Sequence, residues 1–146
     1  MAKGKRSQEG QYVNLPYAQI KSPAWRSLSG AAVRLWLELH TRFNGGNNGA
    51  VRLSTTEAVE TLGLGRATIS RAFLELQEKG FLRLEKPGNW YHRQAHEWRL
   101  TTKPLILATK KVAPSNDWRK FQPPKKQDVG SKLEPSPFSI VPFENP

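Results

Sequence analysis

The chain of 146 residues is long enough for one domain with a hydrophobic core, but not for two. Its net charge of +11 and isoelectric point near 10.3 favour a polyanionic partner, either nucleic acid or an anionic membrane surface. The absence of cysteine excludes disulfides, thiol nucleophiles and thiolate metal sites, and it suits a reducing cytoplasm. Neither a signal sequence nor an apolar run of transmembrane length is present, so we expect no membrane insertion.

The N-terminal part of the chain changes character near residue 11. Residues 1–10 are basic and too polar to bury, which predicts a flexible electrostatic arm. Apolar residues then recur up to Leu28 and require a core to pack on. Ser22 before Pro23 predicts a helix start, with serine as N-cap and proline in the first helical position. A single turn here would place Trp25 on the core.

Residues 29–43 predict the first long helix. Ser29 is its expected N-cap, and the glycine-rich turn that follows ends it. Apolar residues recur at helical spacing, and Val33 and Leu37 widen the stripe, so we expect the most buried helix of the domain. The stripe comprises Ala32, Leu35, Trp36, Leu39 and Phe43. His40 lies on the flank of this helix, and we assign it no chemistry.

A short strand and two further helices follow this turn. Residues 50–53 alternate in polarity and predict the strand. Ser54 and Glu57 form a capping-box pattern that opens a short helix, and Gly63 ends it. A tight corner then leads into a second helix over residues 66–79. Two helices joined by a short turn that contains glycine are the signature of a helix-turn-helix.

The helix over residues 66–79 combines an apolar stripe with a polar opening. The stripe spans about 100° and comprises Ile69, Ala72, Phe73 and Leu76. Gly80 predicts a left-handed stop of the Schellman type. Off the stripe, the first two turns carry the short or guanidinium-bearing side chains that reading of base edges in a groove requires. These candidate DNA-reading residues are Arg66, Ala67, Thr68, Ser70 and Arg71. The alternative is an ordinary amphipathic surface helix with solvated arginines.

Two strands and a long loop complete the predicted domain. Residues 81–85 and 97–101 alternate in polarity, so they predict a hairpin whose loop forms a wing. Strand 50–53 is expected at the edge of the same antiparallel sheet. One face of the hairpin is expected to carry Leu82, Leu84, Trp98 and Leu100. The predicted fold is therefore α+β, a winged helix-turn-helix with a three-helix core, a small antiparallel sheet and a wing.

The central part of the chain resembles the winged-helix DNA-binding domains of bacterial transcription regulators and of phage and plasmid replication initiators. The likeness is carried by LSTTEAVETLGLGRATISRAFLELQEKGFLRLEKPG, followed by HEWRLT. The opening LPYAQIKSPAWRSLSGAAVRLWLEL and the NNG before the first strand are similar to bacterial helix-turn-helix proteins often carried on mobile elements. The resemblance covers roughly residues 11–103. It implies that residues 66–71 read DNA and that the wing touches an adjacent groove or the backbone. Leu74 stands where such domains usually carry a polar residue, and a thymine methyl, a tail segment or the second subunit of a homodimer would explain it.

The predicted wing loop mixes basic and aromatic side chains. Its candidate DNA contacts are Lys86, Trp90, His92 and Arg93. Basic side chains would neutralise phosphates, and an exposed aromatic would lie along a sugar edge or stack on an unpaired base. Alternatively, Trp90 and Tyr91 fold back on the sheet. His92 and His96 lack the further ligands of a metal site, and no phosphate-binding loop, zinc-peptidase pattern or thiol is present, so we expect no metal, no cofactor and no enzyme activity.

The C-terminal segment, residues 104–146, holds eight of the eleven prolines and no apolar period, which predicts a largely disordered tail. Trp118 and Phe121, beside lysine and arginine, are either a partner-binding motif, an added phosphate contact or incidental aromatics of a soluble tail. The predicted organisation is a basic arm over residues 1–10, a winged-helix domain over 11–103 and this tail.

The favoured function is sequence-specific binding of double-stranded DNA by a bacterial transcriptional regulator, in the cytoplasm and associated with the nucleoid. One alternative is a replication-initiation protein of a phage or plasmid-like mobile element, whose tail would recruit a protein partner. Another is an RNA-binding winged-helix protein. The deep groove of duplex RNA excludes side chains, so competition between duplex DNA and duplex RNA separates this alternative from the other two.

Overall fold

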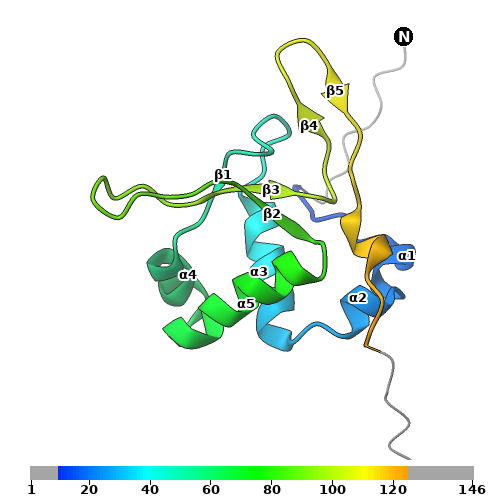
Figure 1. The fold of residues 1–146 in the computed structure, drawn as a ribbon, viewed down its shortest axis with the longest axis horizontal. Coiled ribbons are helices and arrows are strands. Elements are labelled where there is room, and N and C mark those ends of the chain that lie inside the picture. Colours follow the sequence, from blue (N-terminus) through cyan, green and yellow to red (C-terminus); the bar gives the residue numbers. More distant parts are fainter. Residues whose placement is uncertain (1–9, 125–146) are drawn as a thin grey trace, which may run out of the picture.

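The computed structural model describes residues 10–124, and its fold is of the mixed α+β class (Figure 1). The helices are α1 (Tyr17–Ile20), α2 (Pro23–Arg26), α3 (Gly30–Thr41), α4 (Thr55–Leu62), α5 (Arg66–Glu78) and the 3-10 helix η1 (Asp117–Lys120). The strands are β1 (Val51–Arg52), β2 (Leu82–Lys86), β3 (Glu97–Leu100), β4 (Leu105–Ile106) and β5 (Lys111–Val112). Apart from Gly10, the basic arm predicted for residues 1–10 lies outside the described residues.

The helix starts lie at the predicted N-caps. The Ser22 hydroxyl accepts a hydrogen bond from the Trp25 amide at 3.1 Å, and Ser29 does the same for the amide three residues on. At α4, Ser54 accepts from the Glu57 amide at 3.0 Å. The Glu57 carboxylate instead pairs with Arg42 Nη1 at 2.6 Å, so the predicted capping box forms only in its serine half.

The stop of α5 has the predicted Schellman geometry. The Phe81 amide donates to the Leu76 carbonyl at 2.9 Å, and the Gly80 amide donates to the Gln77 carbonyl at 3.2 Å. Gly80 has φ +83°, in the left-handed region that glycine adopts without strain. The chain therefore reverses directly from α5 into β2.

The main sheet is antiparallel with strand order β1-β3-β2, which places β1 at an edge as predicted. Leu82 pairs with Leu100 and Leu84 pairs with Trp98 across the hairpin. This register places the four apolar residues on one face of the hairpin, as predicted, although Leu84 is 40% exposed there. Strand β2 is one of the two edge strands of this sheet, and its register with β3 shifts at a bulge between Leu84 and Lys86.

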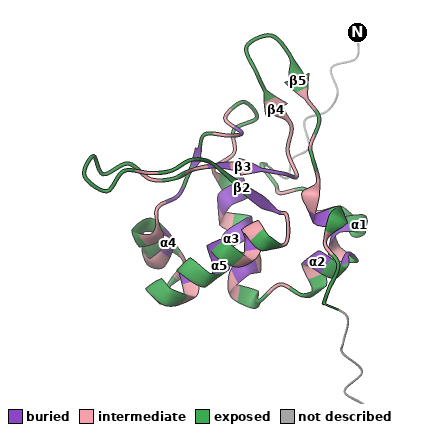
Figure 2. Ribbon diagram, viewed as in Figure 1, coloured by how far each residue is buried: buried purple, intermediate pink, exposed green. Residues whose placement is uncertain are grey.

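The helices and the sheet share one hydrophobic core, in which buried residues gather where α3, α5 and the sheet meet (Figure 2). Phe73 of α5 stacks on Trp98 of β3, with ring centroids 5.1 Å apart and planes 11° apart. Trp25 packs edge-on against Trp36 and Phe81, as its predicted structural role requires. In α3, Leu37 is 37% exposed, so the prediction that it widens the buried stripe is wrong.

His40 is buried rather than lying on an open flank of α3. Its Nδ1 lies 2.7 Å from the Trp36 carbonyl, which only accepts, so Nδ1 carries the proton. Nε2 then accepts from the Thr102 hydroxyl at 2.7 Å in the neutral ring. Burial lowers the pKa of His40 to about 4, against the opposing effect of the hydrogen bond to the Trp36 carbonyl.

Asn48 joins the turn before β1 to the end of β3. Its buried side chain accepts from the Leu100 amide at 2.6 Å and donates to the carbonyls of Leu100 and Lys103, each at 2.9 Å. This single side-chain amide thus satisfies backbone groups of a segment that lies about fifty residues away in the sequence.

The segment after residue 103 contains structure that the sequence analysis did not predict. Strands β4 and β5 form a second hairpin, and η1 packs its buried Trp118 on the core. The expectation of a largely disordered tail is therefore wrong for residues 104–124, because Trp118 finds an apolar surface in the folded domain. The rest of the predicted tail lies outside the described residues.

Candidate nucleic-acid interface

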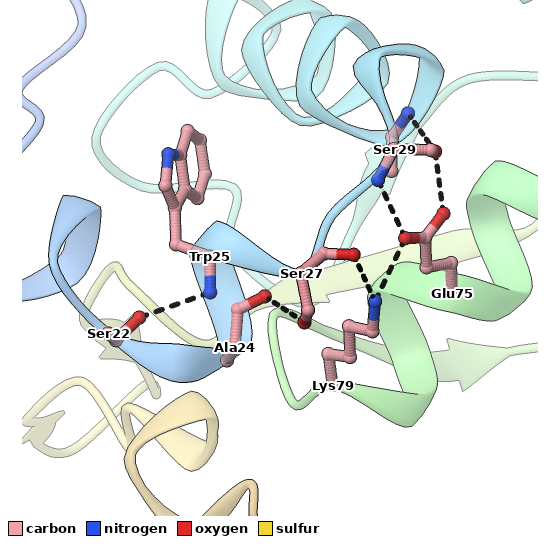
Figure 3. Close-up of polar contacts among 8 residues, drawn as sticks. Ser22, Ala24, Trp25, Ser27, Ser29, Glu75 and Lys79 are labelled. Carbon is pink, nitrogen blue, oxygen red and sulfur yellow. Dashed lines mark hydrogen bonds and ion pairs between the residues drawn. The ribbon is translucent and has the colours of Figure 1, made fainter. Parts of the chain in front are cut away.

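Helix α5 is fixed to the rest of the domain along its stripe and at its C-terminal half. Ile69, Ala72, Phe73 and Leu76 are all buried. The Glu75 carboxylate accepts from the Ser29 amide at 2.8 Å and from the Ser29 hydroxyl at 2.6 Å (Figure 3). Lys79 Nζ donates to the Ser27 carbonyl at 2.7 Å and lies 3.0 Å from Glu75 (Figure 3). The loop between α2 and α3 therefore clamps the last turns of α5.

This clamp also sets the charge state of Glu75. Burial alone would raise the pKa of Glu75, but the hydrogen bonds from Ser29 and the ammonium of Lys79 hold it below its usual value. The carboxylate is therefore ionised at neutral pH, as its role as acceptor for two Ser29 donors requires.

The first turns of α5 lie outside the clamp and carry the predicted DNA-reading residues. Arg66, Ala67, Ser70 and Arg71 are exposed, and Thr68 is half-buried. Arg66 Nη2 donates to the Thr56 hydroxyl of α4 at 3.0 Å, which holds that guanidinium at the helix start. Leu74, one turn further along, is 57% exposed. Four of the five residues predicted from helical periodicity thus stand on one open surface.

The corner between α4 and α5 determines where this surface lies. Gly63 has φ +67° and ends α4, and Gly65 is the N-cap of α5. Leu64 between them is half-buried and packs against the core. Arg34 of α3 donates to the Leu62 carbonyl at 2.8 Å and so satisfies one of the free carbonyls at the end of α4.

The loop between β2 and β3, residues 87–96, is the segment predicted to form a wing; we refer to it as the wing, and it projects beyond the sheet (Figure 1). The Asn89 side chain accepts from the Tyr91 amide at 2.9 Å, and the Asn89 carbonyl accepts from the Gln94 amide at 3.0 Å. The Arg93 amide donates to the Trp90 carbonyl at 3.2 Å and closes the turn. These three bonds fix the tip of the wing.

Two further contacts hold the base of the wing together. His96 Nδ1 accepts from the Gly88 amide at 2.7 Å, and its ring meets Trp98 edge-on. A Cβ on Gly88 would lie 2.2 Å from the Gln94 carbonyl oxygen, so only glycine lets the two sides of the loop approach this closely. His96 is therefore engaged within the wing, and among residues 10–124 no three His, Cys, Asp or Glu side chains are grouped as metal ligands.

The predicted wing contacts are all on the surface. Lys86 ends β2, and His92 and Arg93 stand in the turn, each exposed. Trp90 and Tyr91 are 87% and 89% exposed, so the alternative in which they fold back on the sheet is wrong. Their rings touch each other edge-on, with centroids 5.9 Å apart.

An open groove of about 870 Å³ separates the wing from the start of α4. The wing contributes Trp90, Tyr91, Arg93, Gln94 and Ala95, and the facing wall contributes Arg52, Ser54, Thr56 and Glu57. Through its bond to Thr56, Arg66 of α5 adjoins the same wall. The structure thus brings the N-terminus of α5 close to the tip of the wing, two regions that the sequence predicts as separate candidates.

No protein-family model, no curated protein and no solved structure matches the chain. Within residues 10–124, no helix combines the length and apolar character needed to cross a bilayer.

Sequence reasoning missed the groove residues outside the wing and α5. Arg52 pairs with Glu97 across the sheet at 2.7 Å, and Thr56 holds Arg66. In the sequence, Arg52 is only part of an alternating strand pattern, and Thr56 is only part of a helix-start pattern. Their place beside the wing follows from the pairing of β1 with β3, which no local signal encodes.

Proposed function

We propose that this protein binds double-stranded DNA sequence-specifically through a winged helix-turn-helix and acts as a transcriptional regulator. The observation that carries the proposal is the division of α5 into a clamped C-terminal half and an open N-terminal half. A recognition helix needs this division, because its first turns must enter the major groove while its last turns stay fixed to the domain. The mixed α+β fold and the order of α4, α5, β2, wing and β3 support it.

Two arginines take different roles in this proposal. Arg71 is exposed on the face of α5 opposite the stripe, where a guanidinium reaches guanine N7 and O6 in a bidentate contact. Arg66 lies at the N-terminus of α5, where its hydrogen bond to the Thr56 hydroxyl holds the guanidinium. This position suits contact with a phosphate of the DNA backbone. Arg93 and Lys86 of the wing would contact phosphates of the neighbouring groove.

Charge supports DNA as the partner. The net charge of +11 is large for 146 residues, and it raises the rate and affinity of association with a polyanion. About five or six phosphate contacts from α5, the wing and the flanking segments predict a slope near −5 when log affinity is plotted against log salt.

The test uses the full-length chain. Duplexes that bind should first be selected from a random pool, and the selection should enrich one common sequence. Fluorescence anisotropy of that duplex across a salt series should then give the slope near −5, and a slope flatter than about −2 would contradict the proposal. Arg26→Ala, which removes one exposed charge from α2 at the far side of the domain, is the control and should change the affinity little.

Competition with duplex RNA provides the second arm of the test. The narrow, deep major groove of duplex RNA does not admit α5, so unlabelled RNA of the selected sequence should compete poorly. Competition as strong as that of the DNA duplex would instead favour an RNA-binding protein.

A further inference from the structure

We propose that the groove between the wing and the start of α4 binds unpaired bases of DNA, with Trp90 and Tyr91 as stacking platforms. This inference rests on the proposed DNA-binding function and adds to it the form of DNA that the wing takes. It follows from the exposure of the two rings, from the rigidity of the turn that carries them, and from the polar and basic groups around them.

Trp90 differs from the other tryptophans of the chain in its exposure, and the neighbouring Tyr91 is 89% exposed. The other four tryptophans pack in or against the hydrophobic core, whereas Trp90 is 87% exposed. The two wing rings contact each other at 85° between planes, so ring faces remain open to solvent. Large aromatic side chains left in water at a loop tip are typical of a binding surface.

Hydrogen bonds hold the backbone of the turn that carries these rings. Asn89 binds the amides of Tyr91 and Gln94, and the Trp90 carbonyl accepts from the Arg93 amide. The backbone on both sides of the rings is therefore held by hydrogen bonds before any partner arrives. A platform fixed in this way loses little conformational entropy on binding.

The groove beside the rings suits a nucleotide. The Ser54 and Thr56 hydroxyls and the Gln94 amide line it and match the donors and acceptors of a base edge. The one acidic side chain that lines the groove, Glu57, forms an ion pair with Arg42 at 2.6 Å, so its charge is compensated. The charge of Arg52 is likewise compensated, by Glu97 at 2.7 Å. Arg93 adds a further guanidinium at the rim, where the phosphate of a bound nucleotide would lie.

Unpaired bases fit these observations better than intact duplex. Bases inside a duplex hide their faces in the stack, so an aromatic ring reaches them only where pairing is interrupted. A duplex backbone would use Lys86 and Arg93 but would leave the open ring faces without a partner. Binding of opened DNA is a property that replication initiation requires and that simple repression does not, so this inference bears on the choice between these two functions.

The experiment compares two labelled duplexes of one length and flanking sequence, one fully paired and one with a short central bubble of mismatched thymines. Full-length wild-type protein should bind the bubble duplex about tenfold more tightly, the effect of stacking on roughly one base. Trp90→Ala, and likewise Tyr91→Ala, should remove most of this preference, because each should weaken binding of the bubble duplex much more than binding of the paired duplex.

Two variants serve as controls. Trp90→Phe keeps a stacking ring and should keep most of the preference for the bubble. Tyr17→Ala removes a tyrosine that is 79% exposed on α1, away from the wing, and should change neither affinity. Quenching of tryptophan emission by the bubble duplex should be strong in wild type and weak in Trp90→Phe, which still binds.

The outcomes separate the two proposals. Equal affinity for both duplexes, or an equal loss on both in Trp90→Ala and Tyr91→Ala, would overturn the inference and leave duplex recognition intact. Tight binding of the bubble with negligible binding of the paired duplex would support the inference and contradict the proposed regulator. Absence of binding to either duplex would overturn both.

Discussion

Trp118 of η1 stacks on Phe81 at the start of the main hairpin, with ring centroids 6.2 Å apart and planes 10° apart. The Arg83–Asp117 ion pair at 3.1 Å and the Lys79 ammonium over the Phe121 ring hold the same segment. The chain after residue 103 therefore closes over the C-terminal end of α5, directly behind the helix that carries the proposed DNA-reading residues. This segment follows the domain predicted to end at residue 103, yet it contacts the C-terminal end of α5 and the start of β2.

Gly80 offers a test of this docking, because the backbone of η1 lies against it. A Cβ on Gly80 would lie 2.6 Å from the Asp117 carbonyl carbon and 2.7 Å from the Trp118 amide nitrogen. Gly63 has a similar φ, +67° against +83°, but nothing lies within 4 Å of its Cβ position. Gly63→Ala should therefore cost about 1–2 kcal/mol of unfolding free energy, the usual penalty for a left-handed residue. Gly80→Ala should cost about 2 kcal/mol more, because it also displaces η1.

Urea unfolding of both variants and of Trp118→Ala measures this difference. Gly80→Ala and Trp118→Ala should be clearly non-additive, since either change releases the same segment. Equal costs at Gly80 and Gly63 would show that η1 does not rest on Gly80 in solution.

We expect the folded protein to lose stability in mild acid, because His40 is buried as a neutral imidazole. Its folded pKa of about 4 lies below the usual 6.5, so the unfolded chain binds the proton more readily. Its stabilising contribution is thus complete above about pH 6.5 and is lost as the pH falls towards 4. From these two values the unfolding free energy should drop by about 2 kcal/mol between pH 7 and pH 5.

The measurement is the urea midpoint of wild type and of His40→Gln at several pH values in this window. The Glu75 carboxylate, whose pKa is lowered, contributes stability that is lost only at lower pH, below its usual value, so it does not disturb the window. The glutamine variant is expected to be less stable but to lack the slope. A wild-type midpoint that stays flat from pH 7 to pH 5 would contradict a buried neutral imidazole.

The parts of the fold that the sequence predicted are those encoded by neighbouring residues. Ser22, Ser29 and Ser54 cap helices through amides three residues away, and Gly63 and Gly80 end helices through their own backbone freedom. The open face of α5 was also predictable, because helical periodicity separates it from the buried stripe.

The parts that sequence reasoning missed join residues far apart in the chain. Glu75 binds Ser29 across 46 residues, and Asn48 binds Leu100 across 52. No sequence pattern near Trp118 indicates that its ring stacks on Phe81. The groove beside the wing also depends on residues far apart in the sequence, because its two walls come together only when β1 pairs with β3.

Arg93 provides a test that separates structure from binding in the wing. It has φ +51°, one of two non-glycine residues with positive φ among residues 10–124. Glycine relieves this strain, so Arg93→Gly should leave stability unchanged or raise it by up to about 1 kcal/mol. The same change removes a proposed phosphate contact, so it should weaken binding to every duplex and flatten the salt slope by about one unit.

Thermal unfolding and anisotropy on the selected duplex measure the two effects of Arg93→Gly. Arg26→Ala again controls for the loss of one positive charge. A gain in stability without any loss of affinity would remove Arg93 from the interface.

Arg71 and Arg66 are expected to contribute to DNA binding in different ways. If α5 enters the major groove, the contact of Arg71 with guanine is worth about 1–3 kcal/mol of discrimination. Arg71→Ala should therefore relax the sequence preference while keeping much of the affinity for unrelated DNA.

Arg66 is held at the N-terminus of α5 by Thr56, 3.0 Å away, and faces the DNA backbone in this proposal. Arg66→Ala should lower affinity for every sequence and flatten the salt slope by about one unit.

Both variants should be measured on the selected duplex and on a scrambled one at two salt concentrations, with Arg26→Ala beside them. If Arg71→Ala lost affinity equally on the two duplexes, Arg71 would not read bases, and Ser70, Thr68 or the wing would have to provide the sequence preference.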